Sequence, residues 1–274
     1  MTLLIALKWI LENKEGVVIS SDSKVTVGPV SYETRKVYPI LLKVEDENVP
    51  LAIAGGAGDA SLVKQGYRLC EKVLRKLAVQ KWGRKTPSFE QFEKAVELIE
   101  ANLIKRFRKL RNMGLSLSFN MVLASVDQSG RASIYVFDER GLAEPVHDNP
   151  GFAVIGTGFF TGGNLLLRLL GFEPEKSYMF DVGELTTFVI DVVSEIDPAV
   201  GSFIGESYYM RVEKNEVVLG PLKEEAVKEY KERVKLRKDI IRRLWKLLDL
   251  VGEQKIVEKI DELEEKFLRE SFDK

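Results

Sequence analysis

The order of strand-like and helix-like segments constrains the fold of this chain more than any other feature of its sequence. Short apolar, β-branched runs predict strands, and apolar residues spaced three or four apart predict helices. Blocks of predicted strands alternate with pairs of predicted helices, which favours an α+β sandwich of antiparallel sheets between helix layers. The predicted elements are strands at 3–11, 16–21, 25–30, 36–44 and 51–54, helices at 59–79 and 88–111, strands at 115–126, 132–137 and 152–155, helices at 161–170 and 183–196, and a hairpin at 202–212 and 216–219.

The composition changes after the Gly220-Pro221 pair. Residues 223–274 are rich in Lys, Glu, Arg and Leu, and apolar positions recur at helical spacing before and after Gly252. We therefore expect one domain at residues 2–220 and a C-terminal helical hairpin extension at residues 221–274. The extension would either cover the core or hold a partner and define the assembly.

The charge balance argues against nucleic acid and membranes as partners. The chain has 41 Lys and Arg residues against 42 Asp and Glu residues, a formal net charge of −1, so no global field recruits polyanions. No apolar run is long enough to span a bilayer, and the N-terminal run is too short for a signal sequence. Because the single Cys70 excludes an internal disulfide, we expect a cytoplasmic protein. The heavy use of Lys, Glu and Arg suggests a heat-adapted source.

A histidine-dependent nucleophile has little support in this sequence. His147 is the only histidine, and its loop-like surroundings predict a surface residue. Cys70 lies in an apolar helical stripe and is expected in the core, and no His and Cys residues have zinc-site spacing. The chain's own α-amino group is an alternative base, with a reference pKa of about 8. Removal of Met1 would give Thr2 both a hydroxyl and this amine, a chemistry that needs no metal or organic cofactor.

Five segments resemble motifs of the proteasome β-subunit family, in the family's order and at nearly its spacing. They are residues 16–26 (GVVISSDSKVT), 35–38 (RKVY), 51–60 (LAIAGGAGDA), 156–158 (GTG) and 197–201 (DPAVG). The resemblance covers about residues 2–218. It implies a four-layer αββα sandwich of the N-terminal-nucleophile (Ntn) hydrolase type, with the helical hairpin as an addition.

The resemblance also implies a role for each matching residue. Thr2 would be the nucleophile, and Lys36 would be a cation that favours its deprotonation. Asp22 would orient and pair with Lys36, and the backbone N–H of Gly55 would form the oxyanion hole. Further matches are Thr157 and Asp197, which support the amine in this family, and Lys24, Val25, Thr26, Ile53 and Ala57, which would shape a mainly apolar substrate pocket.

The sequence departs from the family pattern in three places. Val200 replaces a serine that bonds the nucleophile's amine, so that hydrogen bond is missing or replaced. The first hairpin, at residues 8–15, is longer than in typical β subunits. The helical tail after Pro221 has no counterpart in ordinary β subunits.

These features favour a threonine-type peptidase that acts on polypeptides through an acyl-enzyme on Thr2. Water as the next acceptor gives hydrolysis, whereas a peptide amine gives ligation. Connectases, archaeal protein ligases similar to proteasome β subunits, also carry an additional C-terminal domain, so a connectase-like transpeptidase is the alternative. A non-catalytic component of a proteasome-like assembly is a third possibility. The chain would assemble into a ring, or act as a monomer whose C-terminal helices bind a partner.

Overall fold

The computed structural model describes residues 2–11, 13–22, 24–27, 30–33, 35–202 and 204–272. For residues 25–27, 30–33, 178–179 and 264–272 it describes the backbone alone. The chain divides into two compact units, Met1–Tyr230 and Lys231–Lys274. No helix among the described residues is long and apolar enough to cross a membrane.

The first unit contains two five-stranded antiparallel sheets. The first sheet has the order β10-β1-β2-β11-β12 and the second the order β5-β6-β7-β8-β9. The first sheet comprises β1 (Leu3–Leu11), β2 (Lys14–Asp22), β10 (Phe152–Gly156), β11 (Ile204–Glu213) and β12 (Glu216–Pro221). The second comprises β5 (Val37–Val44), β6 (Glu47–Gly58), β7 (Phe119–Val126), β8 (Ala132–Phe137) and β9 (Ala143–Pro145).

A shared apolar core joins the two sheets. Leu4 and Ile19 of the first sheet pack with Ile53, Val122 and Ile134 of the second, and all five side chains are fully buried. Face-to-face packing of this kind follows from strands that are apolar on the inward face. The structure is therefore a mixed α and β fold with two stacked antiparallel sheets, as the sequence predicts at this level.

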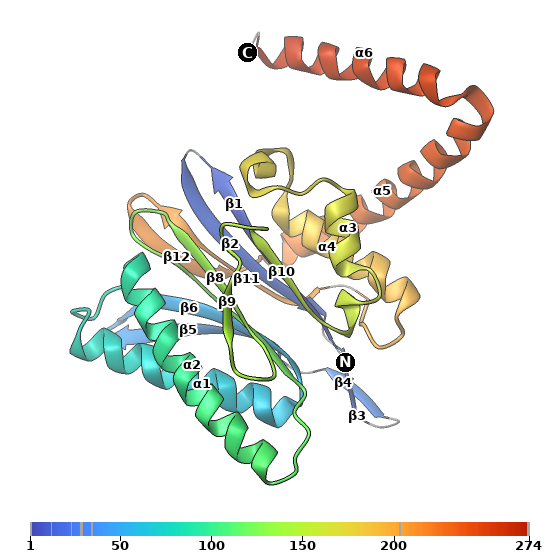
Figure 1. Ribbon diagram of the computed structural model, residues 1–274. Coiled ribbons are helices and arrows are strands. Elements are labelled where there is room, and N and C mark those ends of the chain that lie inside the picture. Colours follow the sequence, from blue (N-terminus) through green and yellow to red (C-terminus); the bar gives the residue numbers. More distant parts are fainter. Residues whose placement is uncertain are drawn as a thin grey trace. The chain divides into compact units, whose positions relative to one another are not determined.

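Helices α1 (Ala60–Gln80) and α2 (Phe89–Asn112) cover the outer face of the second sheet (Figure 1). Asp59 begins α1 by accepting from the Ser61 N–H at 2.8 Å, and Ser88 begins α2 in a capping box with Gln91. The buried residues of α2 are Phe92, Ala95, Val96, Ile99, Leu103 and Phe107.

Helix α4 (Val182–Ile196) packs against β1, β2 and β11 of the first sheet, and the shorter α3 (Gly163–Leu169) packs against α4 (Figure 1). Two 3₁₀ segments accompany them, η1 (Thr157–Phe159) directly after β10 and η2 (Pro174–Met179) beside β1. The predicted helices at 161–170 and 183–196 correspond to α3 and α4.

The segment after Asp22 differs from the prediction. Instead of one strand at 25–30, the backbone forms a separate two-stranded hairpin of β3 (Lys24–Val27) and β4 (Val30–Glu33). The sequence Gly28-Pro29 at its tip is a strong turn signal that the prediction absorbed into a strand. Both tip residues lie outside the described residues.

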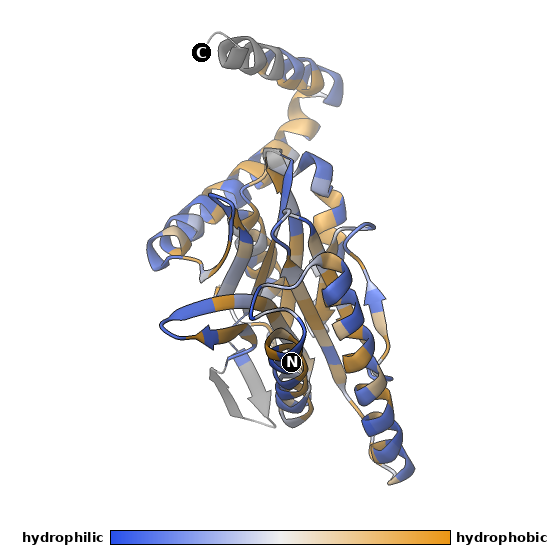
Figure 2. Cartoon of the chain, turned by 90° about the vertical axis from the view of Figure 1, so that its left-hand side faces the viewer, coloured by the Kyte–Doolittle hydropathy of each residue, from blue (hydrophilic) through white to orange (hydrophobic). Residues whose placement is uncertain are grey.

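The second unit consists of most of α5 (Glu224–Val251) and all of α6 (Glu253–Phe272). Gly252, with φ of +87°, separates the two helices, as predicted from the composition. Figure 2 shows hydrophobic and hydrophilic residues interleaved along α5 and along the coloured first part of α6. Many of the apolar side chains of this unit are exposed, including Leu236, Trp245 and Leu263.

Candidate active site

A buried ion pair between Asp22 and Lys36 is the centre of the candidate site. Asp22 ends β2 and Lys36 immediately precedes β5, so the pair links the two sheets. Lys36 Nζ donates to Asp22 Oδ1 at 2.7 Å, and the side chains are 4% and 0% exposed. Asp22 Oδ1 also accepts from the Leu3 N–H (2.8 Å), and Oδ2 accepts from the N–H groups of Lys24 (3.1 Å) and Gly201 (2.9 Å). Four donors therefore hold this carboxylate.

The surroundings of Lys36 lower its pKa. Burial is the largest cause, since it disfavours the ammonium form, and the negative charges of Asp22 and Glu206 oppose it. Lys36 Nζ also donates to the Lys24 carbonyl oxygen. Its amine is thus fixed in place and gives up a proton more readily than an exposed lysine.

Glu206 supports the Lys36 segment and was missed by the sequence analysis. Glu206 Oε2 accepts from the backbone N–H groups of Lys36 (2.9 Å) and Val37 (3.1 Å), and Oε1 lies 3.2 Å from Arg35 Nε. The pairing of β11 with β2 shifts register between Ile204 and Glu206. Such an irregularity redirects a side chain without a signal in residue spacing.

Thr2 immediately precedes β1, and hydrogen bonds hold the backbone on both sides of it. Its carbonyl oxygen accepts from the Gly158 N–H (3.3 Å) and the Thr157 hydroxyl (3.5 Å), and the next N–H, that of Leu3, reaches Asp22. Gly156 adopts φ of +91°, and a Cβ there would lie 2.1 Å from the Thr2 carbonyl oxygen. The GTG segment therefore sets the position of Thr2, which is 5% exposed.

Asp197 is connected to Thr157 through Thr161, a residue that the sequence analysis did not single out. Asp197 Oδ2 accepts from the Thr161 hydroxyl at 3.1 Å, and this hydroxyl lies 3.5 Å from the Thr157 carbonyl oxygen. Asp197 Oδ1 accepts from the Ala199 N–H at 2.9 Å. Val200, where the family has serine, is buried and contributes only its backbone N–H, which donates to the Asp197 carbonyl oxygen (3.0 Å).

Strand β6 faces the first sheet with Ile53, Gly55 and Ala57. A Cβ at Gly55 would lie 2.4 Å from a methyl group of Leu4, so glycine permits this close approach of the sheets. The Gly56 N–H donates to the Lys36 carbonyl oxygen (3.2 Å). Because N–H groups alternate along a strand, the Gly55 N–H faces β7 instead. The role of the Gly55 N–H as an oxyanion donor stays a prediction. This role requires the N–H to turn away from β7.

The remaining predicted pocket residues lie on the segment after Asp22. Lys24 Nζ donates to the Pro198 carbonyl oxygen at 2.5 Å, which ties this segment to the loop that contains Asp197. Val25 and Thr26 belong to β3, and their side chains lie outside the described residues. A pocket formed by these residues stays a prediction.

Comparison with solved structures decides the fold. A Gly-1 mutant of Anbu from Hyphomicrobium sp. strain MC1 superposes with a TM-score of 0.64 over 90% of this chain and 97% of that chain, at 13% sequence identity. The chain has a proteasome-like Ntn fold. No protein family and no curated protein matches the sequence. At this identity the likeness concerns the fold alone.

The prediction that His147 lies on the surface is wrong, and the prediction that Cys70 lies in the core is confirmed. His147 is 5% exposed and packs against the rings of Phe89 and Tyr135. The aromatic neighbours come from distant parts of the chain, so the loop composition around His147 gave no sign of them. Cys70 is a residue of α1, and its side chain is fully buried in the core.

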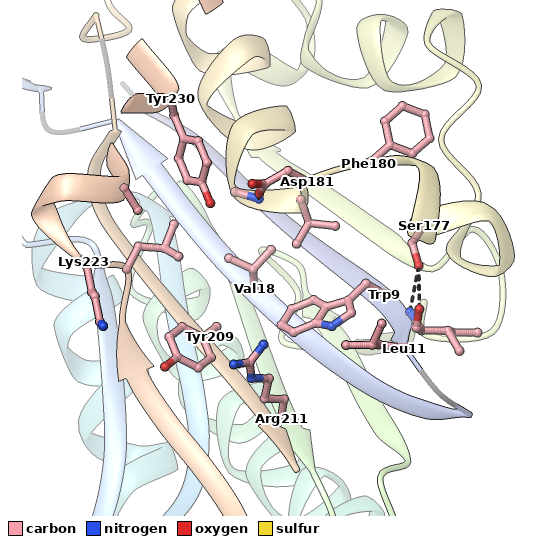
Figure 3. Close-up of a pocket in the computed structure, with 15 residues that line it drawn as sticks. Trp9, Leu11, Val18, Ser177, Phe180, Asp181, Tyr209, Arg211, Lys223 and Tyr230 are labelled. Atoms are coloured by element: carbon pink, nitrogen blue, oxygen red, sulfur yellow. Dashed lines mark hydrogen bonds between the residues drawn. The ribbon is translucent and has the colours of Figure 1, made fainter. Parts of the chain in front are cut away.

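The Ntn-like unit also contains a cavity of about 420 Å³ on the outer face of the first sheet (Figure 3). Trp9, Phe180, Tyr209 and Tyr230 contribute aromatic rings to its walls. Ser177 closes one side, where its hydroxyl accepts from the Ile10 N–H at 2.8 Å. None of the sequence-predicted site residues lines this cavity.

Proposed function

We propose that this chain is an N-terminal threonine hydrolase: a threonine-type peptidase that acts through an acyl-enzyme on Thr2 after removal of Met1. The observation that carries the proposal is the buried Asp22–Lys36 pair, whose carboxylate also binds the N–H of the residue after Thr2. The proteasome-like fold supports it, and we assign the unit a four-layer αββα architecture.

In the proposed mechanism, Thr2 Oγ1 attacks a peptide carbonyl carbon while the free α-amino group takes the hydroxyl proton. The carbonyl π electrons move to the oxygen, and their return breaks the C–N bond. The departing amine takes the proton, and water then cleaves the ester. Lys36 favours the Thr2 alkoxide and keeps the α-amine neutral, because like charges lower the pKa of an amine. The assignment of the oxyanion donor to Gly55 rests on the sequence resemblance.

A second candidate function is a connectase-like transpeptidase. The helices α5 and α6, which the sequence resemblance over residues 2–218 does not include, favour it. In this reaction a second peptide's amine, in place of water, attacks the acyl-enzyme ester. The product is a new peptide bond rather than a free carboxylate. Both candidates take a polypeptide as substrate and use the same Thr2 residue.

The experiment that tests the proposal is incubation with a peptide epoxyketone, followed by intact mass and N-terminal peptide mapping. We expect loss of Met1 and one adduct on Thr2, and no adduct on a Lys36→Ala variant that keeps its circular dichroism spectrum. Retained Met1, or a free Thr2 that never forms the adduct, contradicts the proposal and favours a non-catalytic assembly component. Peptide cleavage with and without an added peptide amine then separates hydrolysis from ligation.

A further inference from the structure

The second unit exposes apolar side chains on both of its helices. In α5, Leu244, Leu247 and Val251 are 39%, 43% and 46% exposed, and in α6, Ile260 and Leu263 are 42% and 59% exposed. Residues three and four apart share one face of a helix, so each set forms a continuous stripe. Two such stripes of similar length are left partly exposed in the described part of this unit.

The two stripes match each other in an antiparallel register. Along α5, Leu247 follows Leu244 by three residues, and Val251 follows Leu247 by four. Along α6 in the reverse direction, Ile260 lies three residues before Leu263, and Ile256 lies four residues before Ile260. In this register the facing pairs are Leu244 with Leu263, Leu247 with Ile260, and Val251 with Ile256. Antiparallel helices with this 3–4 spacing pack knobs into holes along the whole seam.

The charges of the two helices are also complementary. Residues 231–246 of α5 hold eight Lys and Arg residues and two acidic residues, whereas α6 holds seven acidic residues and four basic ones. The register that pairs the apolar stripes places Lys246 opposite Asp261. Opposite charges that flank an apolar seam set the choice and orientation of partners.

The short link between the helices makes it costly for them to close on each other within one chain. Gly252 is the only residue between the end of α5 and the start of α6. An antiparallel helix pair needs a loop of about two to five residues. Closure would therefore unwind the first turn of α6, including Glu253.

We propose that the occupant of each stripe is the same region of a second copy of this chain. The α5 helix of one copy pairs with α6 of the other, and the reciprocal pair forms at the same time, which gives a two-fold exchanged dimer. The α5 part of this unit and α6 are each about 30 Å long, so the two helices can pair along their whole length.

Disulfide trapping of the variant Leu247→Cys/Ile260→Cys in the full chain tests the pairing. We expect a covalent dimer on a non-reducing gel, and a mixed dimer when two differently tagged preparations are unfolded and refolded together before oxidation. The control Leu247→Cys/Lys259→Cys keeps the first thiol but moves the second off the seam, and should trap far less. Cys70 stays silent in these experiments because burial raises the pKa of its thiol. A disulfide within one chain, or no disulfide, overturns the proposal.

A charge exchange tests the register. Lys246→Glu should raise the dimer dissociation constant about tenfold at low salt, measured by sedimentation, because it places like charges opposite Asp261 twice in each dimer. The double variant Lys246→Glu/Asp261→Lys should restore the original value. A double variant that remains as weak as Lys246→Glu, with unchanged helix content, overturns this register.

Discussion

At the scale of single residues, the Asp22 carboxylate connects parts of the chain that are far apart in sequence. It accepts from Leu3 at the start of β1, from Lys36 before β5 and from Gly201 in the loop before β11. Its full set of donors compensates the cost of burying a negative charge. Loss of the carboxylate would therefore affect stability as well as chemistry.

Asp22→Ala should lower the free energy of unfolding by about 3–5 kcal/mol, because it leaves the Lys36 ammonium buried without its counter-charge. Urea denaturation followed by circular dichroism measures this change. The control is Asp46→Ala, which removes an exposed carboxylate from a turn and should change stability by less than about 0.5 kcal/mol. Equal effects of the two substitutions would contradict the structural role of Asp22.

The lowered pKa of Lys36 predicts a dependence of stability on pH. Between that lowered pKa and the ordinary value of 10.5, the unfolded chain binds more protons at this site than the folded chain. The contribution of Lys36 to the unfolding free energy therefore rises as the pH increases through this window. Urea unfolding from pH 7 to 10 should show wild type gaining stability relative to Lys36→Met. A constant difference would show that the pKa is not lowered.

Because Glu206 positions the Lys36 segment, its loss should affect the reactivity of Thr2. Glu206→Ala removes the acceptor of the Lys36 and Val37 N–H groups and should slow the labelling of Thr2 by an epoxyketone about tenfold. Glu206→Gln keeps a carbonyl acceptor and should recover most of the rate. If both variants react equally slowly, the charge of Glu206 acts on Lys36 directly. If neither variant is slowed, Glu206 is not a positioning residue.

At the scale of elements, the sequence predicts most strands and helices because their apolar periodicity is strong and local. The buried stripe of α2 and its Ser88 cap are visible in the residue pattern. The short β9 and the β3–β4 hairpin were not predicted, because strands of three or four residues carry too little periodicity. In the site, the motif segments predict the Asp22–Lys36 pair, whereas Glu206 depends on an irregular register that only tertiary packing determines.

The turn at Gly156 allows a matched comparison of two glycines with positive φ. Gly156→Ala places a Cβ against the Thr2 carbonyl oxygen, whereas Gly114→Ala at φ of +78° meets nothing within 4 Å. Both substitutions should cost about 1–3 kcal/mol of backbone strain, and Gly156→Ala should cost about 1–3 kcal/mol more through overpacking. Thermal unfolding measures the difference, and equal losses would argue against the tight approach of Gly156 to Thr2.

At the scale of the whole molecule, the stacking of the two sheets creates both the core and the candidate site. The sequence predicts this architecture from the order of its elements. It could not predict the environment of His147, because Phe89 and Tyr135 reach it from a helix and a strand that are distant in sequence. Composition predicts the change at the C-terminal helices, but the exposure of their apolar faces is a property of the folded chain.

The buried Cys70 provides a report on the integrity of the first unit as a whole. Its side chain is fully enclosed between α1 and the second sheet, and burial raises the pKa of its thiol. Reaction with a thiol reagent should therefore require opening of the core, and its rate should rise with urea in step with global unfolding. Fast labelling of the native protein in water would contradict this packing.

The contact between Asp22 and Gly201 also sets when the site can exist during synthesis. These residues are separated by 179 positions, and Glu206, which holds Lys36, follows Gly201 in the chain. A ribosome releases residues in order, so a nascent chain contains Thr2, the proposed nucleophile, well before it contains the loop that completes the surroundings of the Asp22 carboxylate. The proposed hydrolase would therefore have little opportunity to cleave neighbouring nascent chains. Its chemistry becomes available only when most of the first unit has left the exit tunnel.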